Sequence, residues 1–184
     1  AGILFIVLNH AGDVMSAKLA MDMAKREGIT VRQVLTHEDI SGGPRENPEE
    51  RRGLAGCLPV IKIAGAAAEQ GRPLEECAAL AERMEANMAT LAVALSGATH
   101  PSTGDVIAEI PDGMMVVGMG QHGEAGGGTQ PLKTADATAE IMLETLLADI
   151  QAQPGDELFV MLNGTGATTL MELYLVLRRV GQVL

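Results

Sequence analysis

The stretch Ile3-Leu4-Phe5-Ile6-Val7-Leu8-Asn9-His10-Ala11-Gly12-Asp13 decides how this chain folds. Its first six residues are apolar without alternation, which is typical of a buried strand in a parallel sheet. A short polar turn follows, and the next helix is expected from Val14 to Arg26, with Gly28 ending it. A second strand is expected from Thr30 to Leu35. The chain is therefore predicted to open with a β-α-β unit.

Asp13 follows the first strand at its carboxyl end, the edge where open α/β sheets bind ligands. As the N-cap of the next helix this aspartate would be structural, and its position alone favours that interpretation. As a site carboxylate it could instead accept a proton from a substrate hydroxyl. Leu19, Met23 and the alanines of the helix are expected to form its inner face.

The first half continues with a polar segment and a pair of helices. Residues 37–52 contain two glycines and two prolines, which predicts a long mobile excursion or a lid. Residues 53–70 and a segment from Pro73 to about Met88 predict two antiparallel helices, which hold the only cysteines, Cys57 and Cys77, as small buried residues. The arginines of the polar segment are diluted by glutamates, which favours a solvated face over an anion site; they are Arg45, Arg51 and Arg52.

The second half is expected to be an α/β unit with a mixed sheet. Short strands are predicted near residues 91–95, 106–110 and 114–118, a helix at 134–150 and a buried strand at 158–162. Thr168 or Thr169 should begin the final helix. The weakest join falls near residues 88–90. We therefore expect a mainly parallel half, residues 1–90, with the Asp13 turn and the helix pair, and a second half, residues 91–184, with the loop described next.

The loop Gly118-Met119-Gly120-Gln121-His122-Gly123-Glu124 follows an apolar strand. Glycines permit positive φ and let a bound group approach the backbone, and sites are often built on such loops. A flexible surface turn with a solvent-facing histidine is an equally good interpretation on composition alone. The glycines formally fit G-x-G-x-x-G, but no helix begins there, which argues against dinucleotide binding.

Composition narrows the possible classes of function. The chain has 184 residues, of which 47% are hydrophobic and 2% aromatic, and its net charge is −11. That charge repels phosphate backbones and few rings are available to stack on bases, so nucleic acid is not an expected partner. Neither a signal peptide nor a membrane-spanning run is visible, which predicts a cytoplasmic protein without membrane contact. The apolar ends, at Ala1 and Leu184, favour a fragment of a longer protein.

Four stretches, taken together and in this order, resemble one family. They are residues 9–14, residues 52–68, the loop at 118–126, and Asn163-Gly164-Thr165-Gly166 running on to Tyr174. Their order and spacing are similar to the substrate-binding K subunit or domain of dihydroxyacetone kinases, and the resemblance covers nearly the whole chain. No single stretch is specific, whereas four in register are.

The resemblance implies that His122 attacks the ketone carbonyl of dihydroxyacetone and holds it as a hemiaminal. Asp13 would then take the proton from the attacking hydroxyl. The resemblance also places ATP, or a tightly bound ADP, with Mg²⁺ on a separate nucleotide-binding L domain or subunit, so this chain itself would hold no cofactor and no metal. A homodimer and a role in glycerol metabolism are further implications. The implied substrate-binding residues are Asn9, Gly12, Gly120 and Gly123.

Departures from the family pattern leave two functions open. Leu8 stands where the family often has lysine, Ala125 replaces the proline after His-Gly-Glu, and the family's glycine-serine-glycine-histidine loop would lie upstream of this chain. One hypothesis is a kinase component acting on dihydroxyacetone or a related keto-triose or ketotetrose, which Asp13 favours. The other is a K-like paralogue that captures a ketone and regulates, which Leu8 favours. In either case Asp13 and His122 are expected to face one cleft.

Overall fold

The computed structural model describes residues 2–184. They form two compact units, one that ends at Thr90 and one that runs from Leu91 to Leu184, and each is described by itself. Within residues 2–184, no helix has both the length and the apolarity needed to cross a bilayer.

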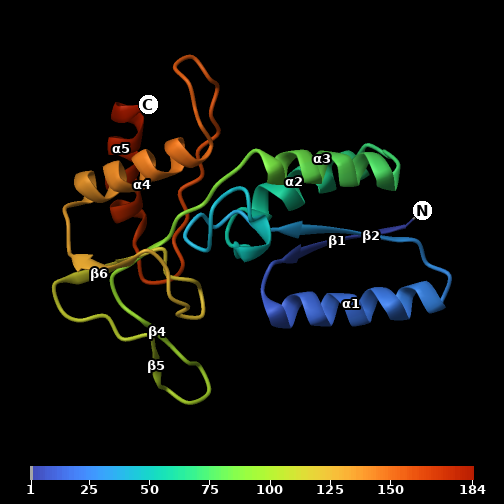
Figure 1. The fold of residues 1–184 in the computed structure, drawn as a ribbon, viewed down its shortest axis with the longest axis horizontal. Coiled ribbons are helices and arrows are strands. Elements are labelled where there is room, and N and C mark those ends of the chain that lie inside the picture. Colours follow the sequence, from blue (N-terminus) through green and yellow to red (C-terminus); the bar gives the residue numbers. More distant parts are fainter. Residues whose placement is uncertain (1) are drawn as a thin grey trace. The chain divides into compact units, whose positions relative to one another are not determined.

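The first unit is a two-stranded parallel sheet covered on both faces by helices (Figure 1). β1 (Ile3–Leu8) pairs with β2 (Val31–Thr36) over their whole lengths. α1 (Ala11–Arg26) lies on one face, and α2 (Cys57–Glu69) and α3 (Leu74–Ala86) lie on the other. A short 3-10 helix, η1 (Pro48–Glu50), interrupts the segment between β2 and α2. The predicted β-α-β opening is confirmed.

The core of this unit lies between the sheet and the α2–α3 pair. It forms because β2 and the two helices each present small or branched apolar side chains to one another. Cys77 is buried on α3 and Cys57 is half-buried on α2, both as free thiols. The buried residues are Val34, Val60, Ala64 and Ala81, with Leu4, Ile6, Met84 and Met88 packed against them.

α1 differs from the prediction in its start and in its inner face. It begins at Ala11, and the residue at its N-cap is His10, whose side chain makes no capping hydrogen bond. The interpretation of Asp13 as the N-cap was therefore wrong. Leu19 and Met23 are 63% and 55% exposed, whereas Ala17 is buried. Two residues correspond to about 200° around a helix, so Leu19 lies on the far side from Ala17.

Buried charges hold the segment 37–52 together. Arg51 is 3% exposed, and Arg52 Nη2 lies 2.7 Å from Oδ2 of the fully buried Asp39. The prediction of a solvated arginine face was therefore wrong for these two arginines. A buried carboxylate needs a paired cation, and such pairs tie the segment down, in contrast to the mobile lid that its composition predicted.

The second unit contains two small antiparallel sheets. β3 (Val93–Ala94), β6 (Met114–Val117) and β7 (Gly128–Pro131) form one sheet in the order β3-β6-β7. β4 (Ala98–Thr99) and β5 (Val106–Ile107) form the other. The α/β class is confirmed, and the strand pairs named in the described part of this unit are all antiparallel.

Two helices complete the second unit. α4 (Ala135–Asp149) and α5 (Leu170–Val183) share a small core formed by Ala139, Leu143 and Val180. Thr134 caps α4, and Thr169 forms a capping box with Glu172 at the start of α5, so the predicted helix starts are confirmed.

One prediction for this unit failed, and one strand was missed. Residues 158–162 were expected to be a buried strand, yet they form no strand and Phe159 is 77% exposed. An apolar run becomes a strand only where a neighbouring strand pairs with it. The missed strand is β7, which pairs with β6. It contains Gly128 and Pro131, and glycine and proline are depleted in strands.

Candidate functional site

The glycine-rich loop, residues 118–127, is the connection of a β-hairpin. It leaves β6 at Val117 and enters β7 at Gly128, and these two residues are opposite each other. Met115 of β6 is fully buried, and Thr138 Oγ1 of α4 lies 3.9 Å from its sulfur. The loop therefore stands on a strand that is anchored in the core of its unit.

A tight turn inside this loop carries His122. The main-chain nitrogen of Gly123 donates to the carbonyl of Gly120 at 3.0 Å, and the nitrogen of Gly120 donates to the carbonyl of Glu124 at 3.0 Å. Gly123 has φ of 84°, a conformation that favours glycine. Gly120 and Gly123 thus form the turn, and the His122 side chain remains 60% exposed.

The base of the loop closes tightly on itself. A Cβ atom placed on Gly126 would lie 1.7 Å from the carbonyl oxygen of Gly118, far inside van der Waals contact. Position 126 therefore requires glycine for this loop path.

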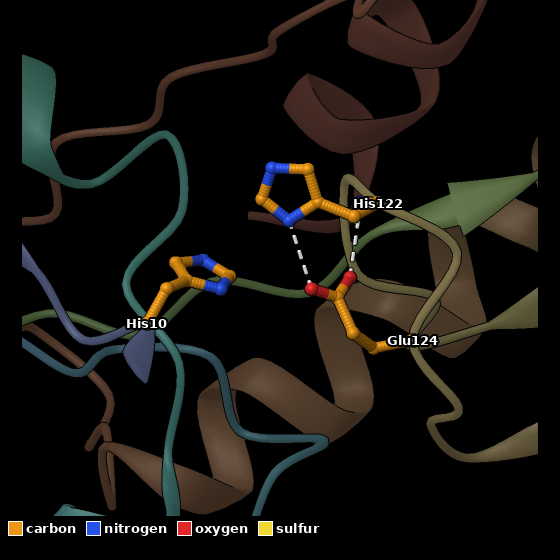
Figure 2. A group of neighbouring side chains, drawn as sticks. All are labelled: His10, His122 and Glu124. Carbon is orange, nitrogen blue, oxygen red and sulfur yellow. Dashed lines mark hydrogen bonds and ion pairs between the residues drawn. The ribbon is translucent and has the colours of Figure 1, made fainter. Parts of the chain in front are cut away.

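Glu124 holds both the ring and the main chain of His122 (Figure 2). Its Oε1 lies 2.9 Å from His122 Nδ1, and its Oε2 accepts from the His122 main-chain nitrogen at 2.9 Å. His122 Nε2 lies 3.4 Å from the amide nitrogen of Gln121, a donor. In a neutral ring, these contacts correspond to the tautomer that donates through Nδ1 and accepts through Nε2.

The Glu124 carboxyl is strongly acidic. Burial opposes its ionisation, but the hydrogen bonds from the His122 ring and from the main chain outweigh it and lower the pKa of Glu124 to about 2. The group is therefore a carboxylate at any physiological pH. A fixed negative charge beside Nδ1 stabilises positive charge on the imidazole ring.

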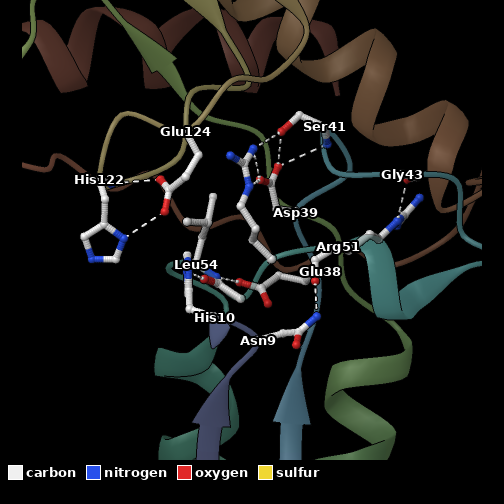
Figure 3. Close-up of polar contacts among 12 residues, drawn as sticks. Asn9, His10, Glu38, Asp39, Ser41, Gly43, Arg51, Leu54, His122 and Glu124 are labelled. Atoms are coloured by element: carbon white, nitrogen blue, oxygen red, sulfur yellow. Dashed lines mark hydrogen bonds and ion pairs between the residues drawn. The ribbon is translucent and has the colours of Figure 1, made fainter. Parts of the chain in front are cut away.

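The carboxyl edge of the parallel sheet holds Asn9. Its Nδ2 donates to the carbonyl of Arg51 at 2.6 Å (Figure 3). The same Nδ2 donates to the carbonyl of Glu49 at 3.1 Å. Its neighbour His10 has Nε2 2.9 Å from the carbonyl oxygen of Gly53. Both side chains thus bind the segment that enters α2. Asn9 therefore has a structural role in positioning this segment.

Gly12 and Asp13 are exposed in the first turn of α1. A negative charge there interacts favourably with the helix N-terminus. Because no side chain caps α1, the Asp13 carboxylate is not committed to main-chain capping. A Cβ on Gly12 would meet nothing within 4 Å, so this glycine leaves open space beside the aspartate.

Glu38 is a buried acid that the sequence reasoning missed. It is 1% exposed, and its Oε1 accepts from the main-chain nitrogens of Leu54 at 2.7 Å and Gly56 at 2.9 Å (Figure 3). Its Oε2 is buried and has no hydrogen-bond partner among residues 2–184. Burial raises the pKa of Glu38, although those main-chain bonds oppose the shift. The sequence feature that could have identified Glu38 is its position two residues after β2, at the edge of the sheet where ligands bind.

The predicted site residues thus fall in two places. His122, Gly120 and Gly123 share the hairpin loop of the second unit, together with Glu124, whose role was not predicted. Asn9, Gly12 and Asp13 share the sheet edge of the first unit. That Asp13 and His122 face one cleft stays a prediction.

Comparisons with known proteins agree with this fold. The chain is 39% identical over 183 residues to the dihydroxyacetone-binding subunit DhaK of PTS-dependent dihydroxyacetone kinase 2 from Listeria innocua serovar 6a, which matches 100% of this chain and 55% of the relative. The chain spans about half the length of the curated DhaK relatives it matches.

Solved structures are similar as well. The dihydroxyacetone kinase of C. freundii in its native form has a TM-score of 0.88 and 31% identity, over 98% of this chain and 32% of that one. The dihydroxyacetone kinase operon co-activator Dha-DhaQ has a TM-score of 0.90 and 30% identity, over 99% of this chain and 56% of that one. The model of the Dak1 domain matches residues 1–184. On the evidence of its fold and of these matches, the chain belongs to the Dak1 domain family.

Proposed function

We propose that this chain is the substrate-binding part of a dihydroxyacetone kinase and that His122 holds the ketone covalently. The observation that carries the proposal is the bond between Glu124 and His122 Nδ1, because in the neutral ring it places the proton on Nδ1 and makes Nε2 the nitrogen that attacks the ketone. The similarity to the dihydroxyacetone-binding subunit DhaK supports the choice of ketone.

In the covalent step, His122 Nε2 forms a bond to the ketone carbon, and the carbonyl π pair moves onto oxygen. The ring gains positive charge, which the Glu124 carboxylate stabilises, and the ring loses its Nδ1 proton as the oxygen gains one. The product is a neutral hemiaminal. Main-chain N–H groups of a glycine-rich loop are suited to stabilise the developing oxyanion.

The other predicted residues have supporting roles in the proposal. Asp13 accepts the proton of the hydroxyl group that is phosphorylated, a role for which an uncommitted carboxylate is suited. Gly120 and Gly123 shape the turn around His122, and Asn9 and Gly12 line the substrate from the sheet edge. The relevant benefit of covalent anchoring is orientation, because a triose offers little contact area.

The phosphoryl donor belongs to a partner in this proposal. ATP, or ADP that is rephosphorylated, is carried with Mg²⁺ by a nucleotide-binding L domain or subunit, and the K part acts as a cytoplasmic homodimer in glycerol metabolism. The purified chain without this partner is therefore expected to show no ATP turnover. ATP hydrolysis by the chain alone would contradict the assignment of the donor.

A second candidate function is a co-activator that binds a ketone without phosphorylating it. The similarity to the co-activator Dha-DhaQ over 99% of this chain favours it, as does Leu8 in place of the family's frequent lysine. Both candidates use His122 in the same way. They differ only in whether the captured ketone becomes phosphorylated when an L-type partner, ATP and Mg²⁺ are supplied.

The test uses dihydroxyacetone labelled with ¹³C at the ketone carbon. Addition of the protein should move the labelled signal from the carbonyl to the tetrahedral range, and a soaked crystal should show density continuous with the His122 ring. His122→Ala should abolish both results, whereas His100→Ala, which removes another histidine of the same unit, should leave them unchanged. Ligand density on His10 or His100, or a ligand held without a bond, would overturn the proposal.

A further inference from the structure

The first unit contains a cavity of about 340 Å³ that the proposed function does not use. It lies beside the carboxyl-terminal end of α3 and is lined by residues from that end and from the segment 37–52. Its polar lining consists of His37, Arg45, Arg51 and Glu85, and its apolar lining includes Pro48 and Met88.

Glu85 is committed to His37. Its Oε1 lies 2.7 Å from His37 Nδ1, and it also accepts from the His37 main-chain nitrogen at 3.3 Å. Glu85 is 9% exposed, and burial raises its pKa, with the charges of His37 and the two lining arginines opposing that shift. The pair fixes the orientation of the imidazole and engages the one acidic side chain that lines the cavity.

Two guanidinium groups are fixed at the same cavity. Arg45 donates through Nη1 to the carbonyl of Ala86 and through Nη2 to that of Met88, each at 3.0 Å. Arg51 is 3% exposed and its Nε donates to the carbonyl of Gly43 at 2.8 Å. These main-chain bonds hold both cations in place at the cavity. Partial burial strengthens their attraction for an anion, because the effective dielectric constant there is lower than in water.

We propose that this cavity binds a small anion through a phosphoryl group, either inorganic phosphate or a small phosphomonoester. Guanidinium groups keep their positive charge at any physiological pH and bind phosphoryl oxygens by charge-assisted hydrogen bonds, and two of them line this cavity. The volume falls at the lower end of the range for small-molecule sites. Pro48 and Met88 offer an apolar wall to a short carbon skeleton. The site does not involve the His122 loop, so it stands independently of ketone binding.

Calorimetric titration of the purified chain tests the proposal. Inorganic phosphate and glycerol phosphate are the probes, and acetate provides a planar anion for comparison. We expect saturable binding of at least one phosphoryl probe and weaker binding of acetate. Arg45→Gln should weaken binding about tenfold or more. Arg45→Lys should lose less affinity because it keeps the charge. The control is Arg83→Gln, which changes an exposed arginine of α3 outside the cavity and should bind as the parent does.

The two ligand sources give different results. Tighter binding of glycerol phosphate than of phosphate identifies a ligand with a carbon skeleton, whereas equal affinities identify the phosphoryl group alone. Amide chemical shifts of the unsubstituted chain give a readout that does not depend on any variant folding, and they should move at Ala86 and Met88. The absence of saturation with both probes, equal affinities of Arg45→Gln and Arg83→Gln, or shifts confined to the loop at 118–127 would each overturn the proposal.

Discussion

Glu38 accepts a 2.7 Å hydrogen bond from the main-chain nitrogen of Leu54, so the end of β2 is joined to the segment that enters α2. A second bond, from Gly56, arrives at the same carboxyl oxygen. One buried side chain therefore fixes the path of the chain where the sheet edge, the polar segment and the helix pair meet.

Glu38→Ala should lower the free energy of unfolding by about 2–4 kcal/mol, because it leaves the two main-chain N–H groups without an acceptor. Glu38→Gln keeps an acceptor oxygen and removes the buried charge. Since burial raises the pKa of Glu38 in the folded chain, ionisation disfavours folding. The parent should therefore lose stability relative to Glu38→Gln as pH rises through that raised pKa. Urea denaturation across a pH series measures this difference, and parallel stability curves would contradict it.

His122→Ala should raise the pKa of Glu124 from about 2 towards the ordinary value of 4.5, because the side-chain hydrogen bond from the ring is lost. The sign of the linkage follows from the lowered pKa. The stabilising contribution of the Glu124 carboxylate is present above pH 4.5 and is lost as pH falls through about 2. Carboxyl ¹³C resonances followed during acid titration measure the shift. His100→Ala is the control, and an unchanged Glu124 titration in His122→Ala would refute the assigned bond.

Gly53→Ala should destabilise the first unit by about 1–3 kcal/mol through overpacking. A Cβ at this position would lie 2.4 Å from Thr36 Oγ1 and 2.9 Å from the main-chain nitrogen of Asn9. Gly65→Ala is the matched control, since a Cβ there meets nothing within 4 Å and the position is inside α2, where alanine is favoured. Thermal unfolding should show opposite shifts for the two variants. A shift of the same sign for both would contradict the close approach at Gly53.

Asp13→Asn should keep the ketone adduct and slow phosphoryl transfer by about 10²–10⁴-fold, because it removes the proton acceptor and leaves His122 intact. The measurement combines the ¹³C adduct signal with phosphate transfer in the presence of an L-type partner, ATP and Mg²⁺. Asp22→Asn replaces another aspartate of α1 and should change neither quantity. Loss of the adduct in Asp13→Asn would show that the aspartate acts in binding rather than in transfer.

The parts of the fold that depend on local sequence could be predicted. The unbroken apolar run of β1, the glycine at the end of α1 and the Thr169 cap of α5 each act through neighbours within a few residues. Local patterns also located the loop that carries His122, because glycine spacing is visible without knowledge of the tertiary structure.

The parts that depend on distant partners could not be predicted in this way. Arg52 binds Asp39 across the polar segment, and nothing in the local composition distinguishes this pair from solvated charges. The burial of Glu38 depends on main-chain nitrogens beyond that segment. On α1 the small residue Ala17 is buried, whereas the larger Leu19 and Met23 are exposed. The size of the apolar side chains did not predict which face of the helix packs.

The exposed side of α1 has a consequence for oxidative damage. Met15 is 72% exposed and Met23 is 55% exposed, whereas Met115 under the His122 loop is fully buried. Peroxide should therefore convert Met15 and Met23 to sulfoxides well before it reaches Met115. Such oxidation turns an apolar stripe of helix surface into a polar one, while β6, which leads into the His122 loop, stays chemically intact.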